Sequence, residues 1–300
     1  QNADFVLCLG CRVSKAVIGY RPEWFCREAS FVSIDIEGVV GRGRVIKMDL
    51  RDFFLEFQNK IPVKSGQWGW LDKAREFKAK WGRELPNPGS HSCPYNFLNK
   101  FFTLKPAGEA CVASSGSIFC VAWHQYVAKP GDRYIVSSHG DMGFEVPAAI
   151  GAAIASEGRA VWPIVGDGSF QLNLQEIQTI VTLNLPVKIL YFNNGGYGAI
   201  QITQDTYFKR RFGVELPCPN IHAICTAYGL KYFGSDQVQT AIDHHGPCLV
   251  EIICDVQQRH PRLMNKMNED GTFKNTPMED MYPFLDREEF RANMFVKEVL

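Results

Sequence analysis

Two apolar stretches, each followed by a short polar turn rich in glycine, constrain the fold of this chain more than any other feature. Val161–Val165 leads into Gly166-Asp167-Gly168-Ser169, and Val187–Phe192 leads into Asn193-Asn194-Gly195-Gly196. The segment between them, Leu172–Leu183, has helical spacing. A strand, a helix and a second strand of these lengths predict a βαβ unit with parallel strands. Such a unit brings both polar turns to the same edge of the sheet.

Together, the two turns carry the groups that a magnesium site needs. Mg²⁺ prefers oxygen ligands and commonly binds one or two carboxylates together with substrate phosphates. Asp167 offers a carboxylate, Asn194 an amide oxygen and Gly196 a backbone carbonyl. The first turn also opens a helix, whose unpaired N–H groups favour an anion such as a diphosphate. The anion-binding candidates of that turn are Gly166, Gly168 and Ser169. A lone Gly-Asp-Gly is also a common turn, so the prediction depends on both turns together.

Alternating apolar runs and helical patterns extend over the whole chain and predict an α/β fold of doubly wound parallel sheets. We expect a partial Rossmann-like domain followed by a complete diphosphate-binding domain. The predicted divisions are residues 1–60 for the first domain, 61–90 for a connector with a helix, 91–255 for the diphosphate domain, and 256–300 for a tail that caps the active site. The first part has only three strand-like runs, so we expect the other strands of its sheet before residue 1.

Composition excludes several classes of function. The chain has 32 basic and 32 acidic residues, so no excess of positive charge indicates nucleic-acid binding. Its apolar runs are too short to span a bilayer, and the first residues do not resemble a signal peptide. Most of its ten cysteines stand in apolar stretches, as expected in a reducing compartment. We therefore expect a cytoplasmic protein that binds neither nucleic acid nor membrane.

The two polar turns also carry a resemblance to a known family. Gly-Asp-Gly followed after 24 residues by Asn-Asn is similar to the signature of thiamine diphosphate-dependent enzymes. The flanking residues resemble the acetohydroxyacid and acetolactate synthase large-subunit-like family, of which this chain matches the C-terminal half. The matching segments are Gly166–Glu176, Asn184–Asn194, Met142–Phe144, Pro147–Gly151, Asp270–Thr272 and Glu279–Met281.

The resemblance implies roles for further residues. Met142 would be the wedge that bends the cofactor, and the Gly140 carbonyl would accept a hydrogen bond from its amino group. The bent cofactor would then attack a 2-keto acid, which we expect to be pyruvate, and transfer a two-carbon unit to a carbonyl acceptor. His139 is an acid/base candidate, although a packed or solvated histidine is an equal alternative. The other cofactor contacts expected are Ser117, Ser169, Tyr197 and Gly198.

In three respects the chain departs from the family pattern. The activating glutamate of the family lies in a pyrimidine-binding domain that this chain lacks. An earlier segment or a partner chain would supply it, which implies a homodimer or homotetramer. The substrate loop includes Gln201 and Thr203. Thr203 occupies the position where enzymes of the family that prefer 2-ketobutyrate carry tryptophan, so the acceptor could be a larger molecule such as a keto sugar. Glu145 replaces the usual glycine, and the sequence offers no explanation.

Cofactor content and chemistry leave alternatives open at this stage. Synthases of the family bind FAD in the central domain, and the corresponding positions here are Arg12, Asp35 and Asp49, which could equally cap helices. Instead of a carboligase, the protein could be a simple 2-keto acid decarboxylase. Without the activating glutamate, it could also be a non-catalytic cofactor-binding remnant.

Overall fold

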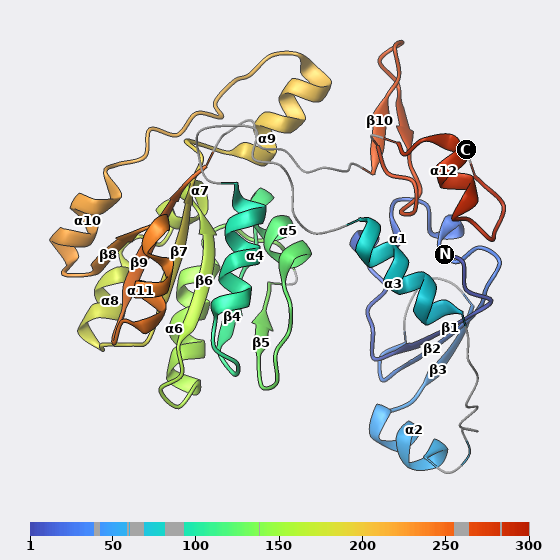
Figure 1. Ribbon diagram of the computed structural model, residues 1–300, viewed down its shortest axis with the longest axis horizontal. Coiled ribbons are helices and arrows are strands. Elements are labelled where there is room, and N and C mark those ends of the chain that lie inside the picture. The colour runs from blue at the N-terminus through green and yellow to red at the C-terminus, as the bar shows by residue number, and fades with distance from the viewer. Residues whose placement is uncertain are drawn as a thin grey trace. The chain divides into compact units, whose positions relative to one another are not determined.

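The computed structural model describes residues 1–38, 43–58, 60, 69–81, 93–137, 139–254, 264–282 and 284–299. The chain divides into two compact units, one made of Gln1–Lys73 with Pro261–Leu300 and one made of Ala74–His260 (Figure 1). The predicted connector at 61–90 lies largely outside the described residues, apart from Gly69–Trp81. Within that part, α3 (Trp70–Lys80) is the helix that the charged and apolar spacing predicted.

The Ala74–His260 unit is built on a parallel sheet of six strands in the order β5-β4-β6-β7-β9-β8. Its strands are β4 (Ala110–Val112), β5 (Arg133–Ile135), β6 (Val161–Gly166), β7 (Lys188–Asn193), β8 (Lys231–Gly234) and β9 (Cys248–Ile253). The central strands β6 and β7 are buried along nearly their whole length, in agreement with their continuous apolar sequences. Their pairing is in register from Ile164 opposite Leu190 to Gly166 opposite Phe192.

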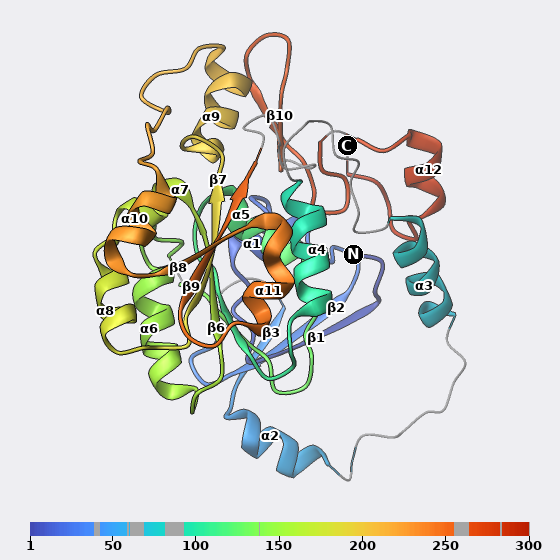
Figure 2. The same ribbon diagram turned by 60° about the vertical axis from the view of Figure 1, so that its left-hand side comes forward.

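Helices cover both faces of this sheet, as Figure 2 shows. The helices are α4 (Pro94–Leu104), α5 (Gly116–Gln125), α6 (Glu145–Ala155), α7 (Asp167–Gln171), α8 (Glu176–Thr182), α9 (Gly198–Thr203), α10 (Ile221–Tyr228) and α11 (Val238–Asp243). One apolar layer joins the sheet to α4, α5 and α11 and includes Phe101, Trp162 and Leu190. A second layer joins the opposite face to α6, α8 and α10 and includes Val165, Phe170 and Tyr191. The π-helix η2 (Gln204–Phe208) continues α9, and the 3-10 turn η3 (Ser235–Gln237) precedes α11.

The strand order places a topological switch point between β4 and β6. From β4 the chain first moves outward to β5, and it then returns to form β6 on the other side of β4. Open parallel sheets bind ligands outside the carboxyl ends of their strands at such a point, because the connections on either side diverge there. The segments that connect these two strand ends to the next helices, called turns below, are Ser114–Ser117, which enters α5, and Gly166–Ser169, which enters α7. The fold alone therefore directs attention to these turns.

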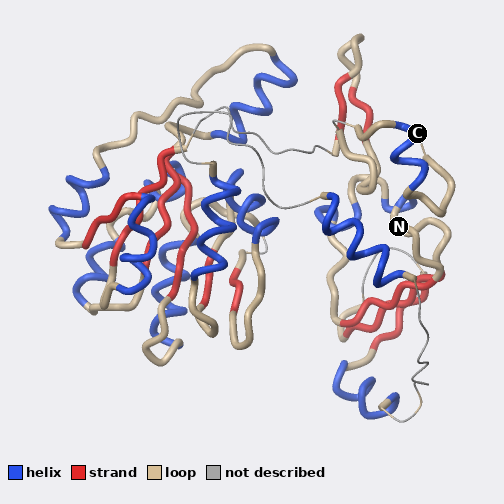
Figure 3. Tube along the Cα trace, viewed as in Figure 1, coloured by secondary structure: helices blue, strands red, loops and turns tan. Residues whose placement is uncertain are grey.

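The other unit contains a parallel sheet of three strands, β1-β2-β3, and an antiparallel pair, β10 with β11 (Figure 3). Its elements are β1 (Phe5–Leu9), α1 (Lys15–Ile18), the 3-10 turn η1 (Pro22–Trp24), β2 (Ser30–Asp35), β3 (Arg44–Lys47), α2 (Leu50–Phe57), β10 (Asn265–Met267), β11 (Phe273–Asn275) and α12 (Arg287–Ala292). Hydrogen bonds tie the two ends of the chain together within this unit. Asn2 donates to the Asn293 carbonyl at 2.8 Å, and Arg27 donates to Glu279 at 2.6 Å.

The predicted α/β class with parallel sheets is confirmed, and some elements differ in detail. Of the helix predicted at Leu172–Leu183, Glu176–Thr182 is helical as α8, and a separate short helix, α7 (Asp167–Gln171), precedes it directly after β6. The end of the chain from 264 onward packs with residues 1–73 in one unit. Its predicted role as an active-site cap stays a prediction. No helix in the described part of the chain is long and apolar enough to cross a membrane.

Candidate cofactor-binding site

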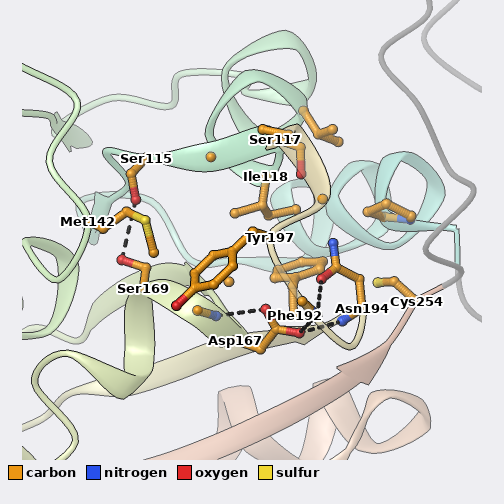
Figure 4. Close-up of a pocket in the computed structure, with 18 of the residues that line it drawn as sticks. Ser115, Ser117, Ile118, Met142, Asp167, Ser169, Phe192, Asn194, Tyr197 and Cys254 are labelled. Carbon is orange, nitrogen blue, oxygen red and sulfur yellow. Dashed lines mark hydrogen bonds between the residues drawn. The ribbon is translucent and has the colours of Figure 1, made fainter. Parts of the chain in front are cut away.

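A cavity of about 250 Å³ lies where four polar turns meet at the carboxyl ends of the strands (Figure 4). The turns follow β4, β5, β6 and β7, and the start of α4 adds two residues. All eleven residues that the sequence assigned to the cofactor line this cavity. They are Ser117, Gly140, Met142, Gly166, Asp167, Gly168, Ser169, Asn194, Gly196, Tyr197 and Gly198. The lining residues that the sequence did not single out include Tyr95, Ser115, Ile118, Phe192 and Cys254.

Asp167 is the central polar group of the cavity. Its side chain is 2% exposed, and three backbone N–H groups donate to it. Gly168 donates to Oδ1 at 2.7 Å, while Asn194 and Gly196 donate to Oδ2 at 3.0 and 3.1 Å. Burial raises the pKa of Asp167 above its ordinary value, and the N–H donors offset part of this effect. The carboxylate thus joins the turn after β6 to the turn after β7.

The Asn194 amide completes a group of three oxygen-bearing residues that fits a hard cation. One terminal atom of the amide lies 3.1 Å from Asp167 Oδ2 and 2.7 Å from the Gly196 carbonyl oxygen. As the side chain stands this atom is the amide oxygen, and only with the amide turned over would its nitrogen be there to donate to both oxygens. Three oxygens placed against one another are favourable only around a cation. Mg²⁺ ligands stand at about 2.1 Å, so neighbouring ligands of an octahedron are about 3 Å apart. The spacing therefore fits Mg²⁺.

Two glycines let the turns approach each other more closely than any other residue would allow. A Cβ atom on Gly168 would lie 2.6 Å from Cε1 of Tyr197 and 3.3 Å from Cε of Met142. A Cβ atom on Gly198 would lie 2.7 Å from the Asn194 amide. All three distances are shorter than an ordinary van der Waals contact. Glycine fits at these positions because side chains that line the cavity pack directly on the backbone.

The turn that carries Met142 is fixed to the first turn of α7. Gly143 donates its N–H to Ser169 Oγ at 2.7 Å, and Asn173 Nδ2 donates to the Gly143 carbonyl at 2.7 Å. Met142 keeps 40% of its surface exposed, although it stands in a tightly bonded turn. A large apolar side chain held at the wall of a cavity is available to pack against a bound ligand.

Comparison with known proteins bears directly on this cavity. Residues 114–252 match the family model described as "Thiamine pyrophosphate enzyme, C-terminal TPP binding domain". These residues include every turn that forms the cavity. The predicted resemblance to thiamine diphosphate-dependent enzymes is thereby confirmed over these residues, since thiamine pyrophosphate and thiamine diphosphate are the same cofactor.

Individual relatives extend the match over most of the chain. Acetolactate synthase 3, chloroplastic, of Brassica napus is 28% identical over 92% of this chain and 46% of its own length. Acetolactate synthase isozyme 1 large subunit of Escherichia coli (strain K12) is 28% identical over 86% of this chain and 48% of its own length. The corresponding large subunit of Lactococcus lactis is 26% identical over 84% of the chain. The chain thus spans about half the length of the curated relatives it matches.

Three residues that the sequence placed near the chemistry do not line the cavity. His139 is exposed, and its backbone N–H bonds to Ser137 Oγ. Gln201 is 3% exposed, and its Nε2 donates to the Val214 carbonyl at 3.2 Å, so it holds the loop after α9. Thr203 is exposed, and its hydroxyl donates to the Ala199 carbonyl within α9.

The positions considered for FAD lie in the other unit. Asp49 caps α2, because its side chain accepts the Arg51 N–H at 2.7 Å. Asp35 accepts the Glu37 N–H at 2.9 Å just after β2. Arg12 is exposed in the turn after β1. Asp49 thus caps a helix, which is the alternative to flavin binding at that position, whereas Asp35 holds a turn.

Proposed function

We propose that this protein binds thiamine diphosphate through Mg²⁺ held by Asp167, Asn194 and the Gly196 carbonyl. It would use the cofactor to decarboxylate a 2-keto acid, pyruvate in the first place, and transfer the two-carbon unit to a carbonyl acceptor. The observation that carries the proposal is the convergence of these three oxygen-bearing groups at the carboxyl ends of the neighbouring strands β6 and β7. The names of the relatives, all acetolactate synthases, support the carboligase chemistry.

Each wall of the cavity would have a separate task. Ser117 and the N-terminal N–H groups of α5 and α7 would bind the diphosphate, since helix N-termini favour anions. Met142 and Tyr197 would hold the rings in place by packing, and the Gly140 carbonyl would accept a hydrogen bond from the amino group. When bound, thiamine diphosphate supplies the electron sink that decarboxylation needs. The apolar residues Ile118 and Phe192 would limit the access of water.

The proton that activates the cofactor has to come from another acid. Asp167 is the one carboxylate among the described residues that line the cavity, and its oxygens are taken by backbone N–H groups and the proposed metal. We propose that a glutamate from a segment preceding residue 1, or from a second polypeptide, supplies that proton. Active sites would then form between parts of a homodimer or homotetramer.

Thr203 leaves the identity of the acceptor open. It is exposed on α9, whose residues Gly198, Ala199 and Ile200 line the cavity, and its own side chain does not reach that far. A tryptophan at this place, as in the resembled enzymes that prefer 2-ketobutyrate, would be larger, so the shorter threonine would allow an acceptor larger than a second keto acid, such as a keto sugar. Release of CO₂ from pyruvate, measured with and without 2-ketobutyrate or a keto sugar, distinguishes these acceptors. CO₂ release with no acceptor consumed and free aldehyde as product would instead indicate a simple decarboxylase.

Binding tests the proposal before any reaction is measured. Titration of the purified protein with thiamine diphosphate, followed by tryptophan fluorescence, should show saturation that requires Mg²⁺. Asp167→Ala should abolish it. A matched control is Asp132→Asn, because Asp132 is also buried in this unit but pairs with Lys105 at 3.0 Å, away from the cavity. Retained Mg²⁺-dependent binding in Asp167→Ala would refute the proposed site.

A further inference from the structure

Glu145, for which the sequence offered no explanation, is a fully buried carboxylate behind the wall of the cavity. It is the first residue of α6, its exposed fraction is 0%, and it does not line the cavity. No lysine or arginine pairs with it in the part of the chain that the structure describes. A buried carboxylate without a cation is costly unless hydrogen bonds satisfy both oxygens.

Hydrogen bonds from two different turns satisfy this carboxylate. Ser114 and Ser115 donate their N–H groups to Oε1 at 3.3 and 3.0 Å, and the Ser115 hydroxyl donates to the same oxygen at 3.0 Å. Ser169 Oγ donates to Oε2 at 2.6 Å. Ser115 and Ser169 both line the cavity, and Figure 4 shows their hydroxyls facing each other. Glu145 therefore clamps the turn after β4 to the turn after β6.

The clamp fixes the direction of the Ser169 hydroxyl. A hydroxyl has one proton, and here it is donated to Glu145. The same oxygen accepts the Gly143 N–H at 2.7 Å, so the bond reaches the turn that carries Met142. Ser169 therefore has no hydroxyl proton left to donate to a ligand in the cavity. Three of the four turns around the cavity are connected through one carboxylate.

We propose that Glu145 is a positioning residue, which holds the diphosphate-facing turns and the Met142 turn in the arrangement that binds the cofactor. The inference rests on the proposed function, because it assigns Glu145 a task at that site. Glu145 acts only through Ser115 and Ser169, since its own carboxylate does not reach the cavity. It is therefore not the acid that activates the cofactor.

Glu145→Gln tests the clamp with little change of shape. The glutamine oxygen keeps the Ser114 and Ser115 N–H bonds, and its NH₂ then faces Ser169 Oγ, which has to turn its proton away. We expect the Kd for thiamine diphosphate with Mg²⁺ to rise about tenfold, as for the loss of one hydrogen bond to a charged group. The Kd for inorganic pyrophosphate with Mg²⁺ should rise by a similar factor, because the diphosphate-facing turns are affected.

Two further variants separate positioning from a general loss of stability. In a Ser169→Ala background, Glu145→Gln should change the Kd by less than about threefold, because the two residues act through one bond. Glu109→Gln is the matched control: Glu109 accepts a bond from Trp162 Nε1 at 2.6 Å ahead of β4 and does not line the cavity, so this substitution should change neither Kd.

The outcomes distinguish this inference from the function on which it rests. If the unaltered protein fails to bind thiamine diphosphate with Mg²⁺, the proposed function and the inference both fall. If it binds, and Asp167→Ala does not, while Glu145→Gln binds both ligands as the unaltered protein does, only the inference is overturned. An equal effect of Glu145→Gln with and without Ser169 would overturn it as well.

Discussion

Replacing Gly168 by alanine tests whether the cavity depends on the close approach of its turns. Gly168 lies in α7 with a backbone conformation that alanine also adopts, so the backbone itself imposes no strain. The new methyl group would meet the Tyr197 ring at 2.6 and 2.8 Å and the Met142 methyl at 3.3 Å. Carbon atoms prefer a separation of about 3.5–4.0 Å, so the Tyr197 ring has to move by about 1 Å.

Two opposing contributions decide the effect on stability. Alanine in a helix gains about 0.5–1 kcal/mol over glycine, whereas overpacking costs about 1–3 kcal/mol. We expect a net loss of about 1 kcal/mol, which for a unit of this size lowers the melting temperature by about 2–4 °C. Gly151→Ala is the matched control, because Gly151 is in α6 with nothing within 4 Å of a new Cβ. That variant should be stabilised by about 0.5–1 kcal/mol.

Binding gives the sharper result. In Gly168→Ala, thiamine diphosphate should bind at least about tenfold more weakly, because a shift of about 1 Å in a ligand-facing ring commonly has effects of this size or larger. Adding Tyr197→Ala to Gly168→Ala should restore part of the lost stability, since the short contact is then gone. Thermal melts and fluorescence titrations of the four proteins measure both effects. If Gly168→Ala is as stable and binds as well as Gly151→Ala, the close packing of the turns has no functional role.

Three further outcomes follow from individual groups. Because burial raises the pKa of Asp167, the folded state binds its proton more tightly than the unfolded state. Without added Mg²⁺, the protein should therefore gain stability relative to Asp167→Asn as pH falls through this raised pKa. Its affinity for Mg²⁺ should decrease over the same pH range. Thermal melts at several pH values measure the first effect, and Mg²⁺ titrations at the same pH values measure the second. Gly196→Ala, whose Cβ would lie 2.4 Å from a backbone carbonyl at a φ of +153°, should be destabilised by about 1–3 kcal/mol in urea unfolding and should lose Mg²⁺ binding. Asp286 caps α12, and the backbone N–H groups of Glu289 and Glu288 that donate to its carboxylate lower its pKa. The stability that this cap gives to α12 should therefore be lost as pH falls through the lowered pKa. Asp286→Ala should speed amide hydrogen exchange in α12 and remove this pH dependence.

The residues of the cavity could be predicted because each polar turn directly follows its apolar strand in the sequence, and because parallel pairing of the strands brings the turns together. β6 and β7 are continuous apolar runs, and each ends directly at its polar turn. Once two such strands are parallel neighbours, Asp167 and Asn194 have to lie at the same edge of the sheet. No long-range information was needed to bring them together.

Elements whose sequence has no strong hydrophobic periodicity could not be predicted. β8 is a four-residue edge strand with one buried residue, Phe233, so the sequence has no continuous apolar run there. It is defined by its pairing with β9 and not by its own composition. The same holds for Gln201, which the sequence assigned to a substrate loop. Its side chain is buried by the loop that returns at Val214, a contact that no local pattern reveals.

Glu145 shows most clearly why a departure from a family pattern needs the structure for its explanation. The sequence marks the change from glycine to glutamate but not its partners, which lie 24 to 31 positions away in two other turns. A charged residue in that place would be destabilising if the turns after β4 and β6 did not present four donors to it. Since both turns carry serines whose hydroxyls face the carboxylate, the glutamate and the serines are best understood as one unit. Substitution at any of these positions should therefore be interpreted together with the others, because the effect of each depends on whether the clamp is intact.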